Sequence, residues 1–99
     1  MYPEEVEEAL KTHPFVADAC VVGVPDEEYG QRIVAAVELH PDGVVDETEL
    51  IAHVKNNLAS YKSPRAIRFV PSLGRAVNGK MDYARHQQEA RDWMSDRSY

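Results

Sequence analysis

Hydrophobic positions along the chain follow two periods, which predict helices and strands in a definite order. Apolar side chains three and four residues apart indicate a helix, whereas a continuous or alternating apolar run indicates a strand. The pattern predicts helices over residues 3–12, 46–59 and 82 to about 93, and strands over residues 16–24, 32–39 and 66–70. The order α-β-β-α-β-α predicts a small α+β domain, with about three strands in one sheet and helices packed on it.

Turn and cap residues set the ends of these elements. His13-Pro14 ends the first helix, because proline pushes the residue before it out of the helical region. His40-Pro41-Asp42-Gly43 is a strong turn signal before the second helix, which Asp46 can cap with Glu49 three residues later. Asp82 can cap the last helix, whose apolar stripe is weak. The first two strands, joined by a short connection, are predicted to be antiparallel.

Length and composition limit the class of protein. With 99 residues, of which 43% are hydrophobic, the chain is predicted to form one domain with a real core. No apolar run is long enough to cross a bilayer, and residues 1–5 do not resemble a signal peptide. The single cysteine, Cys20, lies in an apolar strand-like run. It is expected to be a buried core thiol rather than a nucleophile, in a protein of the reducing cytoplasm.

The net charge of −6 is distributed unevenly along the chain. Residues 1–60 hold three basic and thirteen acidic side chains, whereas residues 61–99 hold eight basic and four acidic ones. The ordinary interpretation is a solvated surface of uneven charge. The functional interpretation is that the C-terminal third meets an anion such as a nucleotide phosphate. Nucleic acid is disfavoured as a partner, because the basic third lacks interleaved aromatic residues.

Several kinds of site are absent from the sequence. The four histidines, which are expected to be ordinary surface or helix-end residues, are far apart and do not form an H-E-x-x-H motif, so no metal site is predicted. The segment 78–81 lacks both the upstream glycine and the following hydroxyl of a phosphate-binding P-loop. The chain also has no nucleophile elbow. The four histidines are His13, His40, His53 and His86.

Two groups of residues remain as candidates. Lys80 follows Asn78-Gly79, two residues that tolerate a positive φ, so it is predicted to lie on a turn and to project toward another molecule. The ordinary alternative is a surface lysine without a specific role. Tyr61, Lys62 and Arg65 could stack on a base and pair with phosphate, or they could instead cap a helix end and solvate a loop.

A set of short motifs, in one order from Tyr2 to about Arg85, resembles the C-terminal domain of adenylate-forming enzymes. Within these the chain is most similar to acyl-CoA synthetases, which include the fatty-acid–CoA ligases. The motifs are Tyr2-Pro3-x-Glu5-Val6-Glu7, His13-Pro14-x-Val16, Val22-Gly23-Val24-Pro25-Asp26 with Gly30, Glu49-Leu50, Tyr61-Lys62-x-Pro64-Arg65 and Arg75-x-x-x-Gly79-Lys80.

This resemblance implies a lid that acts on a partner domain. In such enzymes a larger N-terminal domain binds a carboxylic acid and ATP with its Mg²⁺, and the small domain closes over it. The acid is first joined to AMP, and after the lid rotates the acyl group passes to coenzyme A. The resemblance implies that Lys80 lies between the carboxylate and the α-phosphate, that Tyr61, Lys62 and Arg65 contact the coenzyme A nucleotide, and that Arg75 supports the loop. A fatty acid is the expected substrate.

The chain departs from the family pattern in several places, and these departures change the activity and the loop structure that we expect. The hinge and glycine-rich hairpin that normally precede Tyr2 are missing, so residues 1–99 are expected to be the lid without its N-terminal domain, inactive or nearly so and without bound cofactors. Gly74 replaces a usual proline, which predicts a looser loop. Residues 78–82 also resemble peptide-synthetase adenylation domains, although residues 23–26 and 61–65 favour the coenzyme A branch. A non-catalytic binding or interaction module of the same fold is the other alternative.

Overall fold

A computed structural model describes residues 3–26, 30–58 and 63–97 of the chain. It confirms the predicted α+β class and the element order. The elements are α1 (Pro3–Lys11), β1 (Val16–Asp26), β2 (Gly30–Leu39), α2 (Glu47–Asn57), β3 (Ala66–Phe69) and α3 (Tyr83–Arg97).

The three strands form one mixed sheet in the order β1-β2-β3. Strand β1 runs antiparallel to β2, as predicted, with Val21 opposite Ala35. Strand β3 runs parallel to β2. Strand β1 continues through Pro25 to Asp26, beyond its predicted end at residue 24, and β2 begins at Gly30, before its predicted start at residue 32. Proline is tolerated there because β1 lies at the edge of the sheet and need not donate to a further strand.

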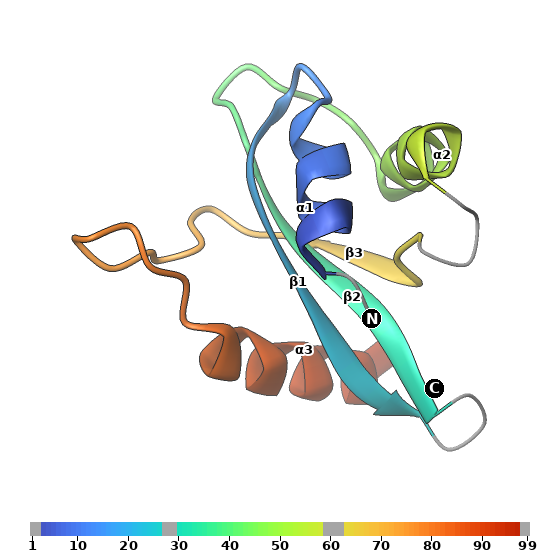
Figure 1. Cartoon of the computed structure of the whole chain (residues 1–99), viewed down its shortest axis with the longest axis vertical. Helices are drawn as coiled ribbons and strands as arrows, with labels where there is room; N and C mark the ends of the chain where they lie inside the picture. The colour runs from blue at the N-terminus through green and yellow to red at the C-terminus, as the bar shows by residue number, and fades with distance from the viewer. Residues whose placement is uncertain (1–2, 27–29, 59–62, 98–99) are drawn as a thin grey trace.

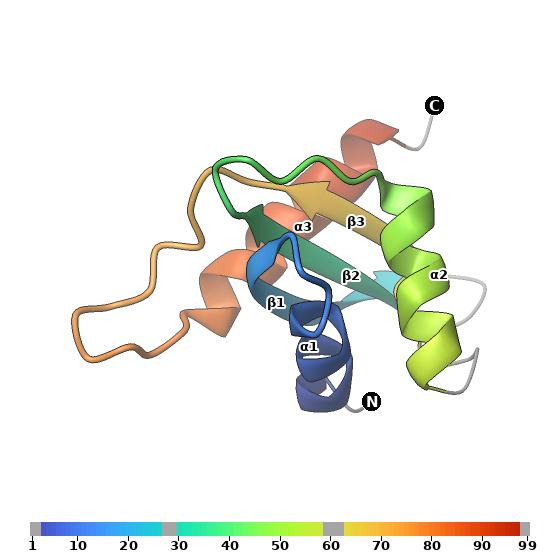
Figure 2. The ribbon, with the colours of Figure 1, turned by 90° about the horizontal axis from the view of Figure 1, so that it is seen from above.

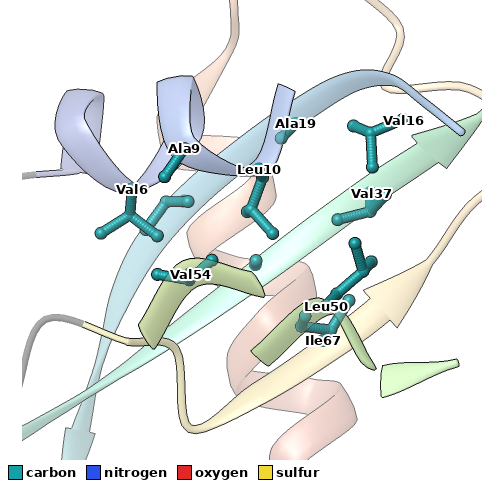
Figure 3. Close-up of a cluster of buried hydrophobic side chains, with 11 residues drawn as sticks. Val6, Ala9, Leu10, Val16, Ala19, Val37, Leu50, Val54 and Ile67 are labelled. Atoms are coloured by element: carbon teal, nitrogen blue, oxygen red, sulfur yellow. The ribbon is translucent and has the colours of Figure 1, made fainter. Parts of the chain in front are cut away.

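Helices α1 and α2 cover one face of the sheet (Figure 1, Figure 2). Figure 3 shows their side chains meeting those of the strands in one apolar cluster. The apolar residues spaced three and four apart in α2 form its buried side, because Leu50 and Val54 are fully buried there and Ile51 and Leu58 pack against the same cluster. The predicted cap is also confirmed, since Asp46 Oδ1 accepts the Glu49 N–H at 2.8 Å.

Helix α3 covers the opposite face, so the domain has three layers (Figure 2). Ala90 is buried against the sheet, and Trp93 and Met94 pack beside it. Asp82 caps this helix as predicted, because its Oδ1 accepts the Arg85 N–H at 3.0 Å. Cys20 of β1 is buried in the apolar cluster between the sheet and α3, and this burial raises the pKa of its thiol to about 12. The interpretation of Cys20 as a core thiol is therefore confirmed.

Two of the histidines, His13 and His86, are buried. His86, on α3, is 2% exposed, and its Nε2 lies 2.8 Å from the Leu73 carbonyl oxygen. The surface alternative was therefore wrong for this residue, whereas the helix-end alternative fits, because His86 lies in the first turn of α3, which packs onto the loop before it. Within the described parts of the chain, no cluster of three or more His, Cys, Asp or Glu is placed to hold a metal. No described helix is long and apolar enough to span a bilayer.

Candidate functional site

The connection from β3 to α3 forms an arm that extends away from the three layers (Figure 1, Figure 2). Its tip is a tight hairpin, in which the Gly79 N–H donates to the Ala76 oxygen at 2.8 Å and the Ala76 N–H donates to the Lys80 oxygen at 2.9 Å. The predicted turn is therefore present. The positive φ falls on Gly79 (85°), and no described residue other than glycine has one. Asn78 has a different role, because its Oδ1 accepts the Lys80 N–H at 3.1 Å.

Lys80 is exposed at this hairpin. Its backbone N–H and carbonyl are both held within the hairpin. In residues 3–26, 30–58 and 63–97, no hydrogen bond or ion pair engages its ammonium group. The arm therefore presents a cation whose backbone is fixed and whose charged end is open to another molecule.

Arg75 lies on the same arm and binds Asp18 of β1. Its Nε lies 2.6 Å from Asp18 Oδ2, and its Nη2 lies 3.0 Å from Oδ1. Its remaining donor, Nη1, binds the Gly79 oxygen at 2.8 Å. The Arg75 guanidinium lowers the pKa of the Asp18 carboxyl, and Asp18 in turn raises the pKa of Arg75. Sequence reasoning did not select Asp18, although an acidic residue inside an apolar strand was a usable signal.

The root of the arm is anchored by Leu73, which is 1% exposed. Its N–H donates to Glu38 Oε1 at 3.1 Å, and its carbonyl accepts Arg85 Nη2 at 2.7 Å. The neighbouring Gly74 has φ 65°, and a Cβ there would lie 2.6 Å from Arg85 Nη2. Gly74 therefore permits close packing of Arg85, where a looser loop was expected.

Arg65 lies elsewhere, just before β3, whereas the arm leaves the other end of that strand. Its backbone N–H donates to the Ile33 oxygen at 2.7 Å. It borders a pocket of about 330 Å³ that is also lined by Arg32, Lys55 and Ser63. Three cationic residues thus line one cavity, and sequence reasoning had selected only Arg65 among them. The structure does not bring Arg65 next to Lys80.

The two other predicted nucleotide contacts, Tyr61 and Lys62, lie outside the described residues. Serine and proline from the same motif, Ser63 and Pro64, line the pocket beside Arg65. The motif therefore borders a cavity suited by charge to an anion.

Comparison with known proteins gives consistent results. The family model described as AMP-binding enzyme C-terminal domain matches residues 5–80. The chain is 48% identical over 90 residues to the medium-chain acyl-CoA ligase Mig of Mycobacterium avium, covering 91% of this chain and 16% of that protein. It is 50% identical over 93 residues to a medium/long-chain-fatty-acid–CoA/3-oxocholest-4-en-26-oate–CoA ligase of Mycobacterium tuberculosis, covering 92% of this chain and 17% of that protein.

Solved structures agree with the sequence relatives. The crystal structure of apo MatB from Rhodopseudomonas palustris superposes with a TM-score of 0.87 at 28% identity, covering 94% of this chain and 18% of that chain. The chain therefore spans less than a fifth of the length of these relatives. The match to the family model covers most of the chain, and the relatives agree with the resemblance that its motifs predicted. The chain belongs to the AMP-binding enzyme C-terminal domain family.

Proposed function

We propose that this chain is the lid of an ATP-dependent acyl-CoA ligase and that it supplies Lys80 to adenylate formation. The observation that supports this most directly is the exposed Lys80 ammonium on a projecting hairpin, with no partner among the described residues. Family membership and the ligase names of the relatives give the chemical context. The partner would be the N-terminal domain of the same enzyme, and the lid alone would be inactive.

The chemistry suits a fixed cation. A carboxylate oxygen attacks the α-phosphorus of ATP, the bond from that phosphorus to the bridging oxygen breaks, and pyrophosphate leaves. ATP enters with its Mg²⁺ as part of the substrate. Two anions must approach each other, so a preorganised ammonium between them lowers their repulsion and stabilises charge in the transition state. Lys80 acts as a charge and must stay protonated throughout.

The second step requires a site for coenzyme A, and the pocket beside Arg65 fits it. Arg32, Lys55 and Arg65 line this pocket, and phosphates of the coenzyme A nucleotide are the anions it would receive. Tyr61 and Lys62 would complete the contacts. Because the pocket lies at the start of β3 and the arm that carries Lys80 leaves its other end, the lid would present a different face in each step. This arrangement supports a rotation of the lid between the two half-reactions.

The acid substrate is proposed to be an apolar carboxylic acid. The relatives are named for medium-chain and long-chain fatty acids and for 3-oxocholest-4-en-26-oate. The choice among these would be made by the N-terminal domain. A panel of fatty acids and steroid acids, assayed with the full-length enzyme for pyrophosphate release, would test this class. Turnover of short polar acids only would contradict it.

The test of the main proposal separates the two half-reactions. In the full-length enzyme, Lys80→Ala should lower pyrophosphate release about a hundred- to a thousandfold, the usual effect of losing one such electrostatic group. Thioester formation from supplied acyl-adenylate should change far less. Arg65→Ala is the matched control and should show the opposite pattern, with a raised KM for coenzyme A. Near-normal adenylation by the Lys80→Ala enzyme would refute the assignment.

A further inference from the structure

Asp18 and Arg75 connect the body of the domain to the hairpin that presents Lys80. We propose that these two residues are positioning residues, which aim the Lys80 ammonium at the reacting groups during adenylate formation. The inference rests on the proposed function of Lys80. It assigns a role in that step to Asp18, a residue on the first strand that lies 57 positions before Arg75 in the sequence.

The geometry forms a continuous link from the sheet to the hairpin. Asp18 belongs to β1, where the antiparallel ladder with β2 fixes its backbone opposite Glu38. Its two carboxylate oxygens accept Nε and Nη2 of Arg75 at 2.6 and 3.0 Å. A bidentate pair of this kind fixes the plane of the guanidinium as well as its distance. The third donor, Nη1, is thereby directed at the Gly79 oxygen, 2.8 Å away.

That carbonyl belongs to the peptide unit that joins Gly79 to Lys80. The rest of the Lys80 backbone is held by its neighbours, because Asn78 Oδ1 accepts its N–H and the Ala76 N–H donates to its oxygen. The side-chain torsions of Lys80 are then the main freedom left to the ammonium. Since a misplacement of about 1 Å can lower a rate about a hundredfold, fixing this backbone affects catalysis directly.

The root of the arm does not depend on this link. Leu73 is bound there by Glu38, Arg85 and His86. The Asp18 side chain is 19% exposed and the Arg75 side chain is 36% exposed. Partly exposed ion pairs contribute little to the stability of a fold. Removing the pair should therefore release the tip of the arm and leave the domain folded.

The experiment compares Asp18→Asn, Arg75→Gln and Arg75→Lys in the full-length enzyme. Each should lower kcat of adenylation about 10- to 100-fold, with KM for ATP and acid changed by less than about threefold. Thioester formation from supplied acyl-adenylate should stay within about twofold of the wild type. The exchanged pair Asp18→Arg with Arg75→Asp should not recover the lost kcat, because an aspartate at position 75 cannot donate to the Gly79 oxygen.

The matched control is Glu8→Gln, which breaks an exposed ion pair with Lys11 within α1, outside the arm. It should leave both half-reactions unchanged. A fall in both half-reactions of the Asp18 and Arg75 variants, together with a large fall in Tm, would show a purely structural pair and would overturn the inference. A raised KM with unchanged kcat would also overturn it, because the pair would then serve binding.

A double variant separates this inference from the function on which it rests. If Asp18 acts through Lys80, Asp18→Asn should have no further effect on adenylation once Lys80→Ala is present. An equal additional loss in that background would overturn the inference. If Lys80→Ala alone is harmless, the proposed function fails. If it is severe while Asp18→Asn and Arg75→Gln are harmless, only the positioning role fails.

Discussion

Glu7 joins three elements through one buried carboxylate, and its replacement by alanine should destabilise the domain strongly. The residue is on α1 and is 5% exposed. Its Oε2 accepts the Val21 N–H at 2.9 Å, and both its oxygens lie 3.0 Å from the Tyr83 hydroxyl, which donates to them. Because β1 is an edge strand, Val21 has no neighbouring strand on that side to accept this N–H.

The expected magnitude follows from these contacts. Without Glu7 the buried Val21 N–H loses its acceptor, which costs about 1–3 kcal/mol. The Tyr83 hydrogen bond contributes less, about 1 kcal/mol, because Tyr83 is 42% exposed and its hydroxyl can turn to water. The relief of carboxylate desolvation offsets part of the loss. The net cost of Glu7→Ala should be about 2–3 kcal/mol, or a fall in Tm of about 8–24 °C for a domain of this size.

Urea unfolding of the 99-residue chain would measure this cost. Glu7→Gln is the matched control and should lose only about 1 kcal/mol, because the amide oxygen can still accept from Val21. Tyr83→Phe should also lose about 1 kcal/mol, and the Glu7→Ala, Tyr83→Phe double variant should cost less than the two single losses together. A loss below about 0.5 kcal/mol for Glu7→Ala would refute the view that this carboxylate joins the elements.

The titration of Tyr83 gives an independent readout of the same contact. Burial, and then the hydrogen bond to Glu7, raise the pKa of its phenol to about 12. A pKa raised above the unfolded value of about 10 stabilises the folded state below pH 10, and this contribution is lost between about pH 10 and 12. Phenolate absorbance should therefore show a late titration in the wild type that is missing from Tyr83→Phe. Glu7→Gln should shift it to lower pH, and an unshifted titration would contradict the contact.

A chemical modification and a substitution test two further features of the fold, the burial of Cys20 and the backbone conformation at Gly74. Cys20 should resist thiol reagents at pH 8 in the folded chain and react on unfolding, because burial raises its pKa to about 12; rapid labelling of the native protein would contradict its place in the core. Gly74→Pro should destabilise the domain by about 2 kcal/mol or more in urea unfolding, because proline cannot adopt φ 65° and the added carbon would meet Arg85. Part of the stability lost in Gly74→Ala should come from the contact of the new Cβ with Arg85, so the double variant Gly74→Ala, Arg85→Ala should recover that part. If the double variant recovers nothing, strain at the positive φ is the sole cause of the loss.

The local pattern of the sequence predicted the elements well, for a physical reason. Burial of one face imposes a period on each helix and strand, and the caps at Asp46 and Asp82 involve residues three positions apart. The last helix shows the limit of this method. The expected stripe was Tyr83, Gln87, Ala90 and Met94, of which Ala90 is buried, Met94 packs beside it and Tyr83 is 42% exposed. The stripe missed His86, because a polar histidine gives no apolar signal even when a carbonyl from the preceding loop satisfies it.

The contacts that fix the arm could not be predicted in this way. Asp18 and Arg75 are 57 residues apart, and Glu7 and Tyr83 are 76 apart, so no local period relates them. The turn before Lys80 was predictable from Asn-Gly, because its geometry depends on a few adjacent residues. The lining of the Arg65 pocket by residues of β2 and α2 depends instead on the packing of the whole domain.

A lid that acts in two steps requires a stiff body, and the structure explains how a thin sheet can provide one. The outer edge of β1 is bound by side chains from both layers, with Glu7 of α1 on the Val21 N–H and Gln87 of α3 on the Gly23 oxygen. Neither helix can move without breaking a hydrogen bond to that edge. Under the proposed function, the Arg65 pocket at the start of β3 and the arm that carries Lys80 from its other end are then fixed to one rigid unit. A rotation of that unit would move Lys80 out of the active site of the partner domain as it moved the Arg65 pocket into place. Adenylate formation and thioester formation could then not occur at the same time.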